Sequence, residues 1–456
     1  MNIQKLSELL QQHPIIEPIV TSITEHGGSA YLVGGAVRDL LLNVPVKDID
    51  IEVHNVSLEQ LSDLLQQYGN VNYVGKSFGV LKLEYSPIDW SIPRTDKSGR
   101  KPEVTLNPNM SIQEALARRD LTMNAMAINL VTHELIDPFG GYHDMLNKIL
   151  RAPNIDFFIE DPLRFYRVMQ FISRFEMEPD AALTKVCKTM DISTVSRERV
   201  EMEFEKLLLK SAAPSRGIRW LHNIGRLQEI LPELAATVGV EQNPEWHPEG
   251  DVFEHTMQAL DEAALLDVPD TVQKLILLYA ALCHDLGKAV TTHIIDGKIT
   301  SYKHEIQGVP LARKLLKRIT NNTIIISTVS LLVRYHMCPG IFVKSNAKPK
   351  AYKRLALKLA PLTNLHMLGL LAYADRRGRK PLTQTTEIDE FMRQAECAQV
   401  LMNLEKPILN GRDLLDVIQP GPLLGKLVKH AYDIQINNNI HDKAELKKRV
   451  LNSIKK

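Results

Sequence analysis

One short stretch near the N-terminus, YLVGGAVRDLLLNVPVKDIDIEV at 31–53, constrains the fold more than any other part of the chain. An apolar run leads into a glycine pair, a second apolar stretch, and then a run in which acidic and branched apolar residues alternate. Because side chains alternate faces along a strand, Asp48, Asp50 and Glu52 share one face and the intervening apolar residues the other. The pattern predicts a strand, a helix, and a second strand that carries carboxylates on one face.

Carboxylates placed in this way suit magnesium and a nucleoside triphosphate. Mg²⁺ prefers oxygen ligands and shares its shell with substrate phosphates, so Asp48 and Asp50 can activate an attacking hydroxyl and neutralise a leaving pyrophosphate. Gly34 and Gly35 let the backbone approach phosphates at the start of a helix, where Arg38 adds donors. Asp-x-Asp alone is more simply the polar face of a surface strand, but the glycine turn upstream favours a nucleotide site.

Composition describes an ordinary globular chain of 456 residues, enough for roughly two to four domains. The net charge is only +1, so a polyanionic partner has to be bound by local basic patches. The four cysteines, Cys187, Cys283, Cys338 and Cys397, form no metal or disulfide pattern. The N-terminus lacks a signal-peptide core, and the longest strongly apolar run, LILLYAALC at 275–283, is too short to cross a bilayer. We expect a cytoplasmic protein without a membrane partner.

The chain divides into an α/β part and a helical part. The β-type runs AYLVGG, DIDIEV, VLKLEY and AMAINLV alternate with helical stretches between about 29 and 140. Beyond about 156, apolar residues recur at helical spacing to the end of the chain. Breakers at 243–251 and 378–384 mark candidate domain boundaries.

Several blocks together resemble a known family. LVGGAVRD followed by KDIDIEV is similar to the active-site signature of the class II tRNA nucleotidyltransferases and bacterial poly(A) polymerases, within the polymerase-β-like superfamily. Four further blocks follow in the family's order: RRDLTMNAMAI (118–128), DPFGGYHDM (137–145), EDPLRFYRVMQFISRF (160–175) and SRERVEMEFEKLLL (196–209). The resemblance covers roughly residues 29–235.

The resemblance implies an α/β polymerase-β-like head followed by mostly α-helical domains, one of them an HD domain. The expected divisions are an N-terminal extension built from a short helix and linker (1–24), a nucleotidyltransferase head (25–150), a helical nucleotide-selection and RNA-binding domain (151–240), the HD domain (241–380) and a C-terminal helical tail (381–456). In the tail, Gly425 is expected to open a helix.

The resemblance also implies the site residues. The expected catalytic residues are Asp48, Asp50 and Asp89, the first two as Mg²⁺ ligands. Asp89 ends a predicted strand. It could be a third active-site carboxylate, or simply an exposed residue at the end of a strand. The expected nucleotide-binding residues are Gly34, Gly35, Arg38, Arg118, Arg119, Asp120, Asn124, Asp161, Arg164 and Arg167.

ATP and CTP share a triphosphate, so a protein that chooses between them has to contact their bases. Asp161 and Arg164 lie three residues apart on a predicted helix, so they share a face and can present acceptors and donors to a Watson–Crick edge. Arg167 lies one turn further. An ordinary intrahelical salt bridge is the alternative. The resemblance implies a further arginine one turn on, but this chain has Gln170 there, so that contact is not expected.

A second chemistry is indicated in the middle of the chain. His255, the adjacent His284 and Asp285, and Asp375 follow the order of an HD-type phosphohydrolase. Imidazoles with carboxylates suit a divalent transition metal such as Ni²⁺, Co²⁺ or Mn²⁺ that polarises phosphate and activates water. His304 and His336 could add ligands, but isolated core histidines are the simpler interpretation. A hydrolase fold that keeps these residues without the activity is the alternative.

The resulting expectation is template-independent addition of CCA to the 3′ end of tRNA from CTP and ATP. Similar HD regions in some bacterial CCA-adding enzymes imply a second activity as 2′,3′-cyclic phosphodiesterase, 2′-nucleotidase or phosphatase. A poly(A) polymerase is disfavoured because Lys76 is followed by Ser77 rather than a second basic residue. Enzymes that add only CC or only A remain open, as does an HD phosphohydrolase with an RNA-binding module. The charged segment 94–109 resembles the family's flexible loop. A monomer or homodimer is expected.

Overall fold

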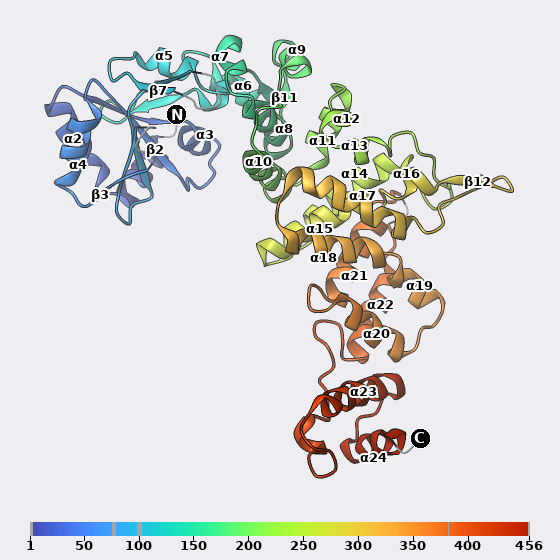
Figure 1. Cartoon of the computed structure of the whole chain (residues 1–456). Coiled ribbons are helices and arrows are strands. Elements are labelled where there is room, and N and C mark those ends of the chain that lie inside the picture. The colour runs from blue at the N-terminus through green and yellow to red at the C-terminus, as the bar shows by residue number, and fades with distance from the viewer. Residues whose placement is uncertain (1–2, 75–78, 98–102, 382, 455–456) are drawn as a thin grey trace. The chain divides into compact units, whose positions relative to one another are not determined.

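The computed structural model describes residues 3–74, 79–97, 103–381 and 383–454 (Figure 1). It forms two compact units, Met1–Leu207 and Leu208–Lys456. Lys76 and Ser77 lie outside the described residues, as does part of the 94–109 segment. The predicted fold class, an α/β head followed by mostly helical domains, is confirmed.

The first unit is built on a seven-stranded mixed sheet in the order β3-β4-β5-β2-β1-β8-β9. Its strands are β1 (Ser29–Val33), β2 (Ile49–His54), β3 (Val71–Tyr73), β4 (Val80–Leu83), β5 (Ile88–Ser91), β8 (Ala127–Asn129) and β9 (Leu135–Ile136). The β-type runs of the sequence therefore form strands as predicted. β2 pairs antiparallel with β1 and parallel with β5, which places β2 at the centre.

The glycine pair makes the turn from β1 into α3 (Gly35–Leu41), the short helix that precedes β2. Gly34 is the residue before the helix and has φ +70°, a backbone conformation that costs little only for glycine. In β2, Ile49, Ile51 and Val53 are buried against the core, while the acidic residues lie on the more exposed face. The predicted alternation of β2 is correct.

The N-terminal segment differs from the predicted helix and linker. It forms two helices, α1 (Ile3–Gln12) and α2 (Ile16–Glu25). α2 buries an apolar stripe that includes Ile16, Ile19 and Ile23, and it packs against β1 and α4 (Leu58–Gln66). The segment that was predicted to be a linker is therefore a helix, and its apolar residues form the face that packs on the sheet.

Short helices complete the first unit. They are α5 (Ile112–Ala117), the 3₁₀ turn η2 (Thr122–Asn124), α6 (Gly141–Leu146), α7 (Ile155–Ile159), α8 (Leu163–Phe175), α9 (Ala181–Thr189) and α10 (Arg197–Leu209), whose last residues enter the second unit. α8 is amphipathic and buries Phe165, Val168 and Phe171 among others. Glu176 ends it in the left-handed conformation.

The second unit is helical. Its HD region comprises α14 (Val252–Leu265), α15 (Thr271–Cys283), α16 (Lys288–Thr291), the hairpin β12 (His293–Ile295) and β13 (Lys298–Thr300), α17 (His304–Ile319), α18 (Thr323–Tyr335) and α21 (Leu365–Arg377). Side-chain caps fix where these helices begin: Asp251 accepts from the Glu254 amide and Asp270 from the Gln273 amide. At Gly287 a side chain would collide with the backbone carbonyl of His304, so the residue before α16 packs directly against the start of α17.

One helical stretch, Thr323–Lys344, is long and apolar enough to cross a membrane by length and composition, with a mean hydropathy of 1.4. Half of that stretch is buried inside the protein. Its first part, α18, packs against α15 and α17 and buries Val329 and Leu332. The core helix of a globular domain passes the same test.

At the C-terminal end, α23 (Pro422–Asn438) and α24 (Lys443–Ile454) pack on each other around a small apolar cluster that includes Leu427, Ala431 and Leu446. The prediction that Gly425 opens the helix is wrong: α23 begins at Pro422, where a missing N–H costs nothing, and Gly425 lies inside it.

Candidate active site and candidate metal centre

The three predicted catalytic carboxylates come together on the central strands of the first unit. Asp50 on β2 is the register partner of Asp89 on β5, and Asp48 immediately precedes β2. Burial raises the pKa of Asp50, and the neighbouring charges of Asp89 and Asp48 raise it further against the opposing Arg119 guanidinium. Lys82 lies 2.8 Å from Asp89. Carboxylates that repel one another in this way fit a site for a divalent cation.

The glycine turn faces an arginine. A side chain on Gly34 would come within 2.5 Å of Nη1 of Arg119. Arg119 is held in turn by Glu52, whose Oε2 accepts from Nη2 at 3.4 Å, while Oε1 of Glu52 lies 3.0 Å from Nε2 of His54. The turn, Arg119 and Glu52 therefore form one charged surface beside the carboxylates of β2.

Replacing Gly34 by alanine should impair nucleotide addition mainly by raising KM for CTP and ATP. The variant forces a side chain into a backbone region that is essentially restricted to glycine, at a cost of about 1–3 kcal/mol, and it displaces Arg119. Steady-state kinetics with each nucleotide tests this. Gly27→Ala is the matched control, because Gly27 also has positive φ but has open space around it. If both variants raise KM equally, the Arg119 contact is irrelevant.

A buried polar chain connects three of the predicted nucleotide-binding segments. Arg38 is only 5% exposed and donates from Nη1 to Asn124 at 2.7 Å. Asn124 donates to Asp120 at 3.0 Å, and Asp120 accepts from Arg167 at 2.6 Å. Burial disfavours the charged carboxylate, but the Arg167 guanidinium outweighs it and lowers the pKa of Asp120 to about 2. The guanidinium of Arg38 also lies over the Phe175 ring. α3, η2 and α8 are thus held in one arrangement.

Asp161 and Arg164, the two proposed base-reading residues, bind different partners in this structure. Arg164 donates to the backbone carbonyls of Phe157 and Arg118 at 2.5 and 2.6 Å. Asp161 instead accepts from Nη2 of Arg199 at 2.9 Å. The alternative, an intrahelical salt bridge between Asp161 and Arg164, does not form between these two residues either. The prediction that both residues lie on one helix is wrong for Asp161, because α8 begins only at Leu163 and Asp161 lies before Pro162, the residue that caps it; Arg164 lies in the first turn.

Three further residues near this site, Glu52, Glu160 and Arg199, were not predicted as site residues. Glu52 was visible in the acidic alternation, and Arg199 lies in a block that the resemblance covers. Arg118 pairs with Glu160 at 3.2 Å, which the adjacent acidic pair of the EDPLR block could have indicated. Gln170 is buried and its Oε1 has no hydrogen-bond partner among the described residues.

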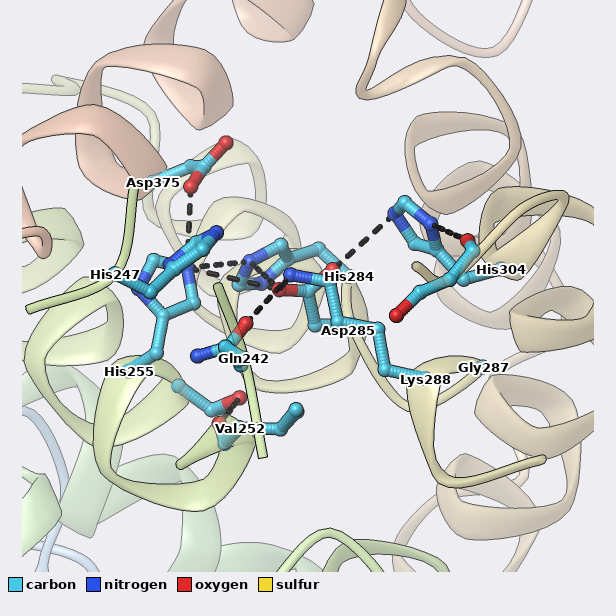
Figure 2. Close-up of polar contacts among 12 residues, drawn as sticks. Gln242, His247, Val252, His255, His284, Asp285, Gly287, Lys288, His304 and Asp375 are labelled. Atoms are coloured by element: carbon cyan, nitrogen blue, oxygen red, sulfur yellow. Dashed lines mark hydrogen bonds and ion pairs between the residues drawn. The ribbon is translucent and has the colours of Figure 1, made fainter. Parts of the chain in front are cut away.

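In the second unit, the predicted HD residues converge at helix ends (Figure 2). His255 comes from α14, His284 and Asp285 follow α15, and Asp375 lies near the end of α21. Nε2 of His255 lies 3.1 Å from Asp375, 3.2 Å from Nε2 of His284 and 3.6 Å from Asp285. All four side chains are buried. His255, His284 and Asp375 offer ligand atoms within 4.8 Å of one another, the spacing of a metal site.

Two histidines that the sequence favoured as isolated core residues are not isolated. His304 begins α17, His336 follows α18, and their Nε2 atoms lie 3.1 Å apart. Both approach Oδ1 of Asp285, at 3.3 and 3.7 Å. Both histidines lie far from Asp285 along the chain, so this contact could not be predicted from residue spacing. The order of the motifs alone does not distinguish a metal ligand from a core residue.

Fixed charges surround the HD residues. Lys288 lies 2.7 Å from Oδ2 of Asp285, and it also donates to Gln242. Burial opposes ionisation of Asp285, yet Lys288 and His284 hold its pKa well below the usual range. Asp375 is held low in the same way, because the bidentate guanidinium of Arg379 outweighs burial in setting its pKa. Both carboxylates are therefore ionised at neutral pH.

The histidines differ in charge preference. Burial together with His304 and His284 lowers the pKa of His336 to about 3. For His284 burial acts in the same direction, but the Asp285 carboxylate outweighs it and raises the pKa of His284. A proton can thus occupy the cluster of His255, His284 and Asp375 when no metal does, and metal binding there would have to displace that proton.

Family models match three parts of the chain: the poly A polymerase head domain at residues 30–151, the probable RNA and SrmB-binding site of polymerase A at 174–237, and the HD domain at 252–369. Among curated relatives, the multifunctional CCA protein of Pasteurella multocida is 34% identical over 395 residues, covering 84% of this chain and 91% of the relative. That of Mannheimia succiniciproducens is also 34% identical, with 84% and 92% covered.

Solved structures agree in fold. The Bacillus stearothermophilus CCA-adding enzyme in complex with CTP matches with a TM-score of 0.64 at 20% identity, over 96% of this chain and 97% of that one. The Thermotoga maritima CCA-adding enzyme complexed with tRNA matches with a TM-score of 0.60 at 18% identity, over 97% and 95%.

Proposed function

Because this chain belongs to the family of multifunctional CCA proteins, we propose that the two sites described above carry its two activities. It is a nucleotidyltransferase that adds CCA to the 3′ end of tRNA without a nucleic-acid template, and its HD domain adds a phosphohydrolase function. The observation that carries the first assignment is the register of Asp50 with Asp89 beside the Gly34 turn.

In nucleotide transfer, the 3′ hydroxyl of the tRNA attacks the α-phosphorus of CTP or ATP, and pyrophosphate leaves. Asp48 and Asp50 would hold Mg²⁺, which supplies neutralisation of the phosphate charge. Asp89 lies beside Asp50 and is placed to receive the hydroxyl proton or to complete the ligand set. The turn at Gly34, with Arg119 across it, presents donors to the triphosphate.

The entrance to α8 is the proposed base-selection site. Arg164 lies in its first turn and Asp161 lies just before it, and both are partly exposed and hydrogen-bonded to other groups. The proposed nucleotide-binding set also includes Gly34, Gly35, Arg38, Arg118, Arg119, Asp120, Asn124 and Arg167. The backbone bonds of Arg164 fix its guanidinium, so a base can be read by the donors left over.

Replacing Arg164 by alanine should blur the choice among nucleotides more than it weakens triphosphate binding. A site that pairs fully with one base edge rejects others because they leave buried groups unpaired. Misincorporation of UTP and GTP into tRNA lacking its 3′ end should rise on the order of tenfold or more relative to CTP and ATP. Arg393→Ala, at an exposed position on α22 (Thr386–Cys397), is the control. Unchanged exclusion of UTP and GTP would remove Arg164 from base selection.

For the HD domain, we propose hydrolysis of phosphate esters, with 2′,3′-cyclic phosphates and 2′-nucleotides as the substrates implied by its relatives' HD regions. His255, His284, Asp285 and Asp375 would hold a divalent transition metal such as Ni²⁺, Co²⁺ or Mn²⁺, which supplies a nucleophilic hydroxide at neutral pH. Lys288 and Arg379 place positive charge beside the carboxylates and so favour an anionic substrate.

One assay separates the remaining alternatives. The purified protein is incubated with tRNA lacking its 3′ end and with each labelled nucleotide in turn. Addition of C, C and A supports the assignment, long A runs would indicate a poly(A) polymerase, and incorporation of only CC or only A would indicate a partial enzyme. No incorporation would leave an HD phosphohydrolase with an RNA-binding module. The proposed partners are tRNA, CTP and ATP, and the proposed location is the cytoplasm, as monomer or homodimer.

A further inference from the structure

Glu52, the third acidic residue of the alternation in β2, lies between two basic side chains. Its Oε2 accepts from Nη2 of Arg119 at 3.4 Å, and its Oε1 lies 3.0 Å from Nε2 of His54. The side chain of Glu52 is only 12% exposed and that of His54 only 4%. A carboxylate this buried stays ionised only when it is paired, so both contacts support its charge.

Both ring nitrogens of His54 face acceptors. Nδ1 lies 2.8 Å from the backbone carbonyl of Met110, and Nε2 faces the Glu52 carboxylate. Burial disfavours ionisation of Glu52, but the hydrogen bond to His54 and the charge of Arg119 outweigh it and lower the pKa of Glu52. A carbonyl and an ionised carboxylate can only accept, so both nitrogens of His54 carry a hydrogen and the ring is an imidazolium. Its charge-assisted hydrogen bond fixes the Glu52 carboxylate in place.

The guanidinium of Arg119 connects this buried pair to the glycine turn. Nη2 donates to Glu52, and Nη1 lies so close to the turn that a side chain on Gly34 would come within 2.5 Å of it. The side chain of Arg119 is 25% exposed, and Glu52 is the carboxylate with which it forms an ion pair among the described residues. A guanidinium is planar, so holding one Nη sets the direction of the other.

Asp50 is the competing partner for Arg119. Asp50 and Glu52 lie two residues apart on the same face of β2. Burial raises the pKa of Asp50, and the Arg119 guanidinium is near enough to oppose that rise. An arginine released from Glu52 would therefore be attracted to Asp50 instead of staying at the turn.

From these contacts we propose that Glu52 is a positioning residue for nucleotide transfer. Held by His54, it keeps Arg119 at the Gly34 turn and away from Asp50, so that Nη1 is directed to the triphosphate. This inference rests on the nucleotidyltransferase function proposed above.

Glu52 has two opposing effects on a bound triphosphate. Its negative charge repels the phosphates, whereas its hold on Arg119 places a donor for them. We expect the second effect to be larger, because the charge of Glu52 is already neutralised by two cations and a donor fixed in advance loses less freedom on binding. The two effects predict opposite changes in affinity when the carboxylate is removed.

The test compares Glu52→Ala with Glu52→Gln in the full chain by steady-state kinetics on tRNA lacking its 3′ end. Glu52→Ala should raise KM for CTP and ATP on the order of tenfold with kcat nearly unchanged, because the lost contact serves substrate and transition state alike. Glu52→Gln keeps an acceptor for Arg119 and should restore much of the affinity. Glu17→Ala, at an exposed position of α2, is the control. A lower KM in both Glu52 variants overturns the positioning role.

A double variant separates action through Arg119 from a general structural effect. Glu52→Ala should add no further rise in KM to Arg119→Ala, whereas independent effects multiply and would contradict the proposal. Thermal melting checks folding, because Glu52→Ala leaves the His54 imidazolium unpaired. If it does not fold, Glu52→Ala with His54→Leu removes both partners and takes its place.

Binding of CTP by calorimetry keeps this inference separate from the proposed activity. A wild type that adds no nucleotide to tRNA overturns the nucleotidyltransferase assignment. The affinities of wild type, Glu52→Ala, Arg119→Ala and the double variant for CTP then still decide the role of Glu52: equal weakening in the last three supports positioning through Arg119, and undiminished affinity in Glu52→Ala overturns it.

Discussion

Replacing Asp50 by asparagine should lower the rate of nucleotide addition on the order of 10³-fold, because a lost metal ligand removes several kcal/mol of transition-state stabilisation. Asp48→Asn should have a similar effect. Both residues lie on the outward face at the start of β2, opposite the buried Ile49 and Ile51. Primer extension on tRNA lacking its 3′ end measures the loss, and tRNA binding by filter retention should persist.

The same Asp50 substitution should leave thermal stability unchanged or improved. The folded protein raises the pKa of Asp50 above its ordinary value, so the ionised group at neutral pH costs stability, and a neutral amide of the same shape removes that cost. Scanning fluorimetry of Asp50→Asn against wild type measures the change. Asp63→Asn, exposed on α4, is the control for losing a surface charge. An inactive variant that melts well below wild type would mean Asp50 is structural.

The second large effect is expected in the HD domain. Changing His284 and Asp285 together to asparagine should abolish phosphatase and cyclic-phosphodiesterase activity and leave CCA addition nearly intact. Asp48→Asn should do the reverse, because the two sites lie in separate compact units with separate ligand sets. Adding Ni²⁺, Co²⁺ or Mn²⁺ to the stripped enzyme should stimulate hydrolysis more than Mg²⁺ does, since imidazole ligands favour the softer ions.

Folding has to be checked for this double variant. Asp285 is buried beside Lys288, and its loss leaves that cation without its carboxylate. Asp375→Asn is therefore a second test on a different helix, with the Arg379 contact weakened rather than removed. Loss of both activities in a well-folded variant contradicts the two-site assignment, and a wild type that hydrolyses no phosphate ester with any metal would make the HD domain a scaffold.

Local patterns predicted the strands and the order of the motifs correctly. The alternation around Asp50 depends only on neighbouring residues, so the sequence contained all the information needed to place its face. Asp89 was ambiguous because its position depends on β5 pairing parallel to β2, an interaction between segments about 40 residues apart. Register across a sheet is a property of the whole fold rather than of either strand.

Side-chain partners were predicted less well. The spacing of Asp161 and Arg164 predicted one shared helix turn, but α8 begins after Asp161, and the two side chains bind different partners: Arg164 donates to two backbone carbonyls and Asp161 accepts from Arg199. His304 and His336 illustrate the same limit: their Nε2 atoms meet beside Asp285 only because α17 and the end of α18 approach the segment after α15 in the folded chain.

The strand order of the sheet has a consequence for how the active site matures as the chain is synthesised. β1 carries β2 on one edge and β8 on the other, so its second edge stays unpaired until residues 127–129 have been made. At that stage Phe175 has not yet been synthesised, so Arg38 lacks the aromatic ring over which its guanidinium lies in the folded protein. A fragment ending before β8 would contain every catalytic carboxylate and yet expose an open edge that invites aggregation. A fragment that pairs both edges of β1 and also keeps the Phe175 ring beside Arg38 therefore has to extend through α8.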